Sequence, residues 1–152
     1  MRLYLVQHAE ARPEDEDPAR PLTEKGWQDA RRVARHLAGR GVRPPRLVHS
    51  GRLRARQTAD VWAEVLPAAE VAAAPGLDPN ADPLIWAERL EAERDDLMLI
   101  GHLPHLRRLA ARLLCGDAEK GVVAFRNAGV VCLERDAAGH WSLQWAIVPE
   151  MI

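Results

Sequence analysis

The chain has 152 residues, of which 47% are hydrophobic and 28% charged, with a formal net charge of −1. This length is typical of one domain, about 100–200 residues, and the composition excludes a largely disordered chain. We expect a single domain over residues 1–152. We also expect the protein in a reducing cytoplasm, because no apolar run approaches the roughly 20 residues of a membrane span and the N-terminus lacks a signal-peptide core. The two cysteines make no disulfide framework, which agrees with a reducing compartment.

The first half of the chain predicts two strands, each followed by a helix. The expected elements are a strand at 3–6, a proline-rich acidic loop at 8–22, a helix at 24–38, a strand at 47–48 and a helix at 53–66. Thr23 is the expected N-cap of the first helix, and Gly39 with Gly41 ends it. Short apolar runs between turn signals are typical of buried strands.

The second half alternates in the same way and then changes to a hairpin. The expected elements are a helix at 84–94, a strand at 97–100, a helix at 104–114, and strands at 130–133 and 143–147 joined by a turn at 136–139. Trp141 and Trp145 are four residues apart in the last strand and are expected on one face. The order predicts an α/β fold with a mostly parallel central sheet flanked by helices and with antiparallel C-terminal strands.

Polar residues follow three of the expected strands and are the candidates for a functional site. These polar ends are Gln7-His8, His49-Ser50 and Gly101-His102. Ligands of open α/β sheets bind beyond the carboxyl ends of the strands, so these side chains should converge there with Arg54, one turn into the next helix. Two helix N-termini at the same edge favour an anion, and a phosphoryl group fits.

Four segments of the sequence resemble motifs of the histidine phosphatase superfamily, and within it the small SixA-like phosphohistidine phosphatase branch. They are Leu5-Val6-Gln7-His8-Ala9-Glu10-Ala11, Arg20-Pro21-Leu22-Thr23-Glu24-Lys25-Gly26, residues 50–59 (Ser-Gly-Arg-Leu-Arg-Ala-Arg-Gln-Thr-Ala) and Ile100-Gly101-His102-Leu103-Pro104. The segments occur in the family's order, and the resemblance spans the chain from residue 1 to about residue 149. It implies a phosphoglycerate mutase-like fold with no metal and no cofactor.

The resemblance also implies roles for individual residues. His8 corresponds to the nucleophile that takes the phosphoryl group, Arg54 to a phosphate clamp, and His102 to the second histidine, which donates to a non-bridging oxygen. Gln7, Arg20 and Ser50 are expected to contact the substrate. The sequence departs from the family at two positions: Gln7 stands where the family has arginine, and Ala9 stands where it has glycine.

A phosphorylated protein is the expected substrate, either a histidine phosphotransfer domain or a phosphocarrier in signal transduction. Expelling an alkoxide from an ester needs a general acid, whereas a protonated imidazole leaves a phosphoramidate easily. The candidate acids are Asp78 and Asp82, but capping or bounding a turn explains each of them better than proton donation does. Nine arginines and no acidic residue lie between residues 30 and 59, which is a candidate docking face for an acidic partner.

Several alternatives remain open on sequence alone. A phosphate- or phosphohistidine-binding module that has lost catalysis through Gln7 would bind without turnover. A phosphatase of small phosphate esters would depend on Asp78 or Asp82. His102 and His105 have metal-like spacing but no partner ligands, and no pattern typical of nucleic-acid binding or membrane association is present.

Overall fold

A single mixed sheet organises the protein in this computed structural model, which describes residues 1–152. The sheet has six strands in the order β3-β2-β4-β1-β5-β6. The elements in chain order are β1 (Arg2–Gln7), α1 (Glu24–Ala38), β2 (Arg46–His49), α2 (Leu53–Val65), β3 (Glu70–Ala73), α3 (Pro83–Glu91), β4 (Leu97–Gly101), α4 (His105–Cys115), β5 (Val130–Arg135), β6 (Trp141–Ile147) and the short 3₁₀ helix η1 (Pro149–Met151). Strands β1 to β4 are parallel, β5 pairs antiparallel with β1, and β6 pairs antiparallel with β5, which confirms the predicted α/β fold.

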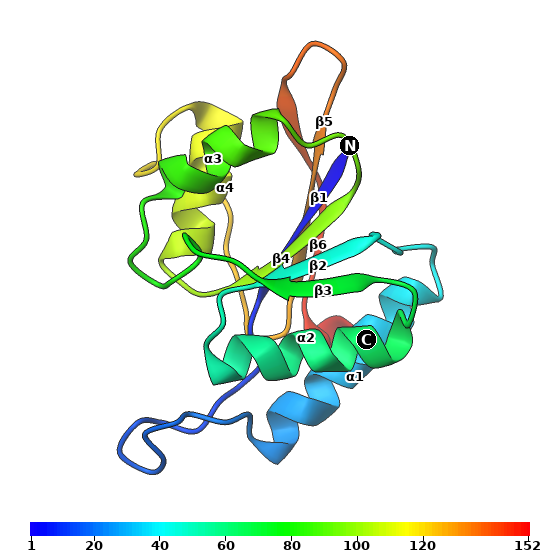
Figure 1. The fold of residues 1–152 in the computed structure, drawn as a ribbon, viewed down its shortest axis with the longest axis vertical. Helices are drawn as coiled ribbons and strands as arrows, with labels where there is room; N and C mark the ends of the chain where they lie inside the picture. The colour runs from blue at the N-terminus through cyan, green and yellow to red at the C-terminus, as the bar shows by residue number, and fades with distance from the viewer.

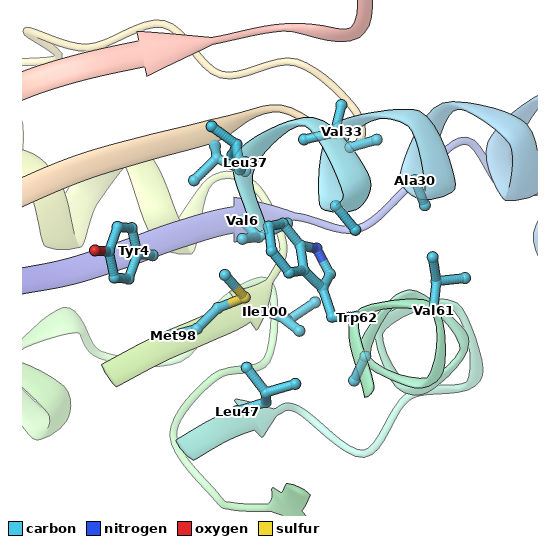
Figure 2. Close-up of a cluster of buried hydrophobic side chains, with 14 of the residues drawn as sticks. Tyr4, Val6, Ala30, Val33, Leu37, Leu47, Val61, Trp62, Met98 and Ile100 are labelled. Atoms are coloured by element: carbon cyan, nitrogen blue, oxygen red, sulfur yellow. The ribbon is translucent and has the colours of Figure 1, made fainter. Parts of the chain in front are cut away.

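The sheet is covered on both faces, with α1 and α2 on one side and α3 and α4 on the other (Figure 1). Alternation along β1 explains this arrangement, because Tyr4 and Val6 join the core beneath α1 and α2 while Leu3 and Leu5 join the core beneath α3 and α4. Figure 2 shows the first of these cores, in which Trp62 of α2 reaches between the sheet and α1. The central strands are therefore buried on both faces up to the edge where their polar ends emerge.

Two features of the sheet differ from the sequence-based expectation. Strand β3 was not predicted, because all four of its residues are exposed and it therefore has no apolar alternation; it is held by parallel pairing with β2. Trp141 and Trp145 do not share a face: Trp141 packs against the α3–α4 core and Trp145 against the α1–α2 core. The reason is an irregular register in which Leu133 pairs with Leu143 and Cys132 with Trp145, so that one extra residue in β6 reverses the alternation.

The local structure around the first helix follows its sequence signals. Thr23 caps α1 as predicted, since its side chain accepts from Gly26 N. Glycine is needed at position 26 because a Cβ atom there would lie 2.1 Å from Glu10 O, in the loop that leaves β1. The glycine therefore lets the loop after His8 lie directly against the start of α1, where Thr23 N donates to Glu10 O at 3.0 Å. None of the helices has the length and apolar character needed to cross a membrane.

Candidate active site

The first candidate residue, His8, lies directly after β1 and is 7% exposed. Its backbone N–H donates to Gly101 O at 3.0 Å, so the pairing of β1 with β4 continues one residue past the strand. Its ring Nδ1 lies 2.7 Å from Ala9 O. A carbonyl oxygen only accepts hydrogen bonds, so Nδ1 carries the proton and Nε2 keeps a free lone pair.

His8 is uncharged at neutral pH. Burial is the main cause that lowers its pKa, to about 4; the hydrogen bond to Ala9 opposes this, and the charges of Arg54 and Arg20 lower the pKa further. An imidazole is a nucleophile only in its neutral form, and burial keeps the His8 ring in that form at pH values well above 4.

A second histidine faces His8 across the edge of the sheet. His102 follows β4, is 1% exposed, and its ring centroid lies 5.1 Å from that of His8. Its Nε2 lies 2.6 Å from Ser50 Oγ, and Arg52 N donates to the same oxygen at 3.3 Å, which leaves the serine hydrogen free to point at Nε2. Burial first, and then the neighbouring His8 and Arg54, lower the pKa of His102 to about 3.

Arg54 supplies a buried positive charge at this edge. It lies in the first turn of α2, is 8% exposed, and its Nε has no hydrogen-bond partner. Burial lowers the pKa of Arg54, and the cations Arg20 and Arg52 add to the effect, yet a guanidinium remains charged at neutral pH. A buried cation with an unused donor is costly unless an anion compensates it, and the uncapped N-terminus of α2 favours the same charge.

Two further expected contacts flank these groups. Gln7 ends β1 half-buried, and its Oε1 is buried without a hydrogen-bond partner. Arg20 adopts a left-handed backbone (φ 50°) and its Nε donates to Arg12 O at 3.1 Å. Its charge contributes to the lowered pKa values of both His8 and Arg54, which places its field at the site.

The two candidate acids have other partners. Asp78 Oδ1 accepts from Arg52 Nε at 2.8 Å in an exposed ion pair. Asp82 caps α3 by accepting from Leu84 N at 2.9 Å. His105 is fully buried with neither ring nitrogen hydrogen bonded, and no three His, Cys, Asp or Glu side chains are grouped so that they could hold a metal ion.

Sequence reasoning missed Asn127, whose Nδ2 donates to His8 O at 2.9 Å. The signal that could have found it is topological. Strand β5 pairs antiparallel with β1, so the segment preceding β5 arrives at the carboxyl end of β1, beside His8. The hairpin prediction gave the antiparallel direction of these strands, but not which neighbour they would pair with.

Taken together, the edge of the sheet holds a neutral imidazole with a free nitrogen beside a second neutral imidazole, a serine hydroxyl and a buried guanidinium. Arg54 Nε and His102 Nδ1 have no partner within the protein and can donate to a tetrahedral anion, and the free nitrogen of His8 can attack a phosphorus atom within it. The segment 50–54 brings the serine and the arginine from one strand–helix turn, in which Gly51 takes a left-handed φ of 90°.

Comparisons with known proteins show the family of the chain and its fold. Residues 3–79 match the histidine phosphatase superfamily (branch 1). An uncharacterized protein of Picosynechococcus sp. is 36% identical to this chain, with 91% of this chain and 87% of the relative covered. The phosphohistidine phosphatase SixA of Escherichia coli is 28% identical, with 98% and 94% covered. The structure of the protein histidine phosphatase SixA complexed with tungstate superimposes with a TM-score of 0.87 at 26% identity, over 99% of both chains.

Proposed function

Because this chain belongs to the histidine phosphatase superfamily, we propose that it hydrolyses phosphohistidine on a protein through a phosphohistidine intermediate on its own His8. The observation that carries the proposal is the state of His8: a buried, neutral ring whose Nδ1 is tied to Ala9 O and whose Nε2 is free beside Arg54 and His102. The likeness to proteins named phosphohistidine phosphatase supports the choice of substrate.

In the first step, Nε2 of His8 attacks the phosphorus atom in line with the leaving nitrogen. The new N–P bond forms as the substrate's N–P bond breaks, and the leaving imidazole retains a proton, so that it departs neutral. Arg54 and a ring N–H of His102 stabilise the charge on the phosphoryl oxygens, and Ser50 orients the His102 ring. In the second step, water attacks the phosphorus atom and His8 leaves, giving inorganic phosphate.

The leaving group favours a phosphoramidate over an ester. A protonated imidazole leaves without help, whereas an alkoxide needs a proton donor. Asp82 is engaged as the cap of α3, and Asp78 accepts a hydrogen bond from Arg52 in an exposed ion pair. Neither side chain is arranged as an acid for an ester, so the site supports phosphohistidine better than a sugar phosphate.

The partner is a histidine phosphotransfer domain or a phosphocarrier, and we place this signalling reaction in the cytoplasm. Five of the nine arginines between residues 30 and 59 lie in α1 or α2, and four of the nine have carboxylate partners at 2.8–3.8 Å. Arg56 differs, because it is exposed near the start of α2, two residues after Arg54, and its side chain makes no hydrogen bond or ion pair. It is therefore the best candidate for contact with an acidic partner surface.

The test compares a phosphorylated phosphotransfer domain with a small phosphoramidate as substrates. Arg56→Glu should raise KM for the phosphoprotein about tenfold and leave hydrolysis of the phosphoramidate within about twofold. Arg43→Glu is the matched control, since Arg43 is exposed before β2, at the opposite edge of the sheet. Equal losses on both substrates would contradict docking through Arg56.

A second candidate function is favoured by one observation, the glutamine at position 7. A binding module that has lost catalysis would retain saturable phosphate binding and show no turnover. A steady-state assay of phosphate release from a phosphohistidine protein separates the two functions. Turnover abolished by His8→Ala supports the phosphatase, and phosphate binding with no turnover supports the module.

A further inference from the structure

The turn at residues 126–129 closes against the end of β1. Ala128 N donates to Gln7 O at 3.0 Å and to His8 O at 3.3 Å, and Asn127 Nδ2 donates to His8 O at 2.9 Å. These bonds come from a segment 119 residues away in the chain from His8. They act on the backbone of the proposed nucleophile.

The peptide group that joins His8 to Ala9 is therefore held at both of its polar ends. Its carbonyl accepts from Asn127 Nδ2, and its N–H donates to Thr58 Oγ1 at 3.0 Å. Thr58 Oγ1 in turn donates to Arg54 O at 2.8 Å, which connects this peptide to the helix that carries the guanidinium. The next carbonyl, Ala9 O, accepts from the His8 ring.

We propose that Asn127 is a positioning residue that fixes the direction and the tautomer of the His8 ring by holding the His8–Ala9 peptide. Rotation of that peptide would move Ala9 O away from Nδ1, and the ring would lose both its orientation and the bond that keeps the proton off Nε2. The proposal rests on the function proposed above, in which Nε2 is the attacking atom. Misplacement by about 1 Å can cost about a hundredfold in rate, so a grip on the backbone matters for kcat.

The turn that presents Asn127 is rigidly supported. Val123 and Phe125, just before it, are buried in the core beneath α3 and α4. Ala128 takes a left-handed φ of 62°, and a Cβ atom at Gly129 would lie 3.0 Å from Arg126 O and from Ile147 O. Because the turn is anchored and tightly packed, the Asn127 amide is held in place and can in turn fix the His8 carbonyl that it binds.

Asn127 acts through the backbone and makes no bond to Arg54, His102 or Ser50. Its loss should therefore lower kcat and leave the binding of an anion unchanged. A loss of stability alone would instead lower kcat and weaken anion binding together. Under conditions where the variant is folded, it would change neither kcat nor anion binding. This split separates a positioning role from a contribution to stability alone.

The experiment uses the full chain with Asn127→Ala, Asn127→Asp and the control Gln144→Ala, an exposed amide that donates only to Ser142 Oγ. We expect kcat of Asn127→Ala to fall about tenfold to a hundredfold, with KM and inhibition by tungstate within about twofold of the parent. Asn127→Asp has the same shape but no donor when ionised, so its kcat should fall at least as far. Recovery of kcat in Asn127→Asp, or a rise in the tungstate inhibition constant of Asn127→Ala, would overturn the proposal.

Nitrogen-15 NMR of the His8 ring, recorded without substrate, keeps this test separate from the proposed function. In the parent, His8 should hold its proton on Nδ1; in Asn127→Ala, the Nε2–H tautomer should gain population, while Gln144→Ala leaves the spectrum unchanged. An unchanged tautomer in Asn127→Ala overturns the positioning role even if the enzyme is active. Absence of turnover in a parent chain with the expected tautomer would overturn the phosphatase function and leave the positioning role standing.

Discussion

Replacing Gln7 by arginine tests how this chain works without a cation directly before the proposed nucleophile, His8. The Gln7 Oε1 atom is buried with no hydrogen-bond partner, so replacing this side chain breaks no hydrogen bond of that oxygen within the protein. A hydrogen bond to a charged group is worth about 1.5–3 kcal/mol and a neutral one about 0.5–1.5 kcal/mol. Gln7→Arg should therefore tighten phosphate binding by about 1–2 kcal/mol, or roughly tenfold.

The same change should destabilise the protein when no anion is bound. The charges of Arg54 and Arg20 already lower the pKa of His8, so a further cation at position 7 adds repulsion in a buried place. The assay measures tungstate inhibition and the thermal midpoint with and without phosphate, with Gln7→Met as the uncharged control. We expect a lower midpoint that phosphate restores. An unchanged tungstate affinity in Gln7→Arg would refute the assignment of Gln7 to the substrate site.

Three further outcomes follow from the geometry. Ser50→Ala should lower kcat about tenfold because the His102 ring loses its only hydrogen bond, and Ser50→Thr, which keeps the hydroxyl, should restore most of it. Asp78→Asn should leave phosphoramidate hydrolysis within about twofold, since we give Asp78 no part in proton transfer; a much larger loss on a phosphate ester than on the phosphoramidate would identify Asp78 as an acid. Acid should destabilise the fold, because burial lowers the pKa values of His8, His102 and His105 to about 4, 3 and 4, below the ordinary 6.5. The unfolded chain therefore binds more protons than the folded chain below pH 6.5. The contribution of these histidines to stability is complete above pH 6.5 and is lost as the pH falls toward 4. Urea unfolding at pH 7.5 and 5.5 should differ by roughly 1 kcal/mol for each histidine, and equal stabilities would contradict their buried, neutral state.

The sequence predicted the parts of the fold that are determined by local chemistry. Apolar runs ending in polar residues gave β1, β2 and β4, and the cap at Thr23 gave the start of α1. Strand β3 has no such signal, because its exposed residues are held by backbone pairing alone. The bulge in β6 is a property of pairing register, which a single strand's pattern does not contain.

In the candidate site, too, local sequence patterns predicted some residues, while contacts between distant segments determine others. The sequence pattern places His8, Ser50, Arg54 and His102 at one edge of the sheet, because each follows a strand or opens a helix, and the structure brings them together there. Asn127 was not found, since its contact joins residues 119 positions apart and depends on which strand β5 chooses as its neighbour. The depressed pKa values likewise arise from burial by elements distant in the chain, which no local pattern reveals.

The most direct test of the account is chemical trapping of the intermediate. A labelled phosphohistidine protein is mixed with the enzyme, quenched within milliseconds in alkali, which preserves phosphohistidine, and the enzyme's peptides are mapped. We predict radiolabel on His8 that appears before free phosphate and is absent from His8→Ala. Release of phosphate at the full rate with no label on this residue would contradict covalent catalysis by His8.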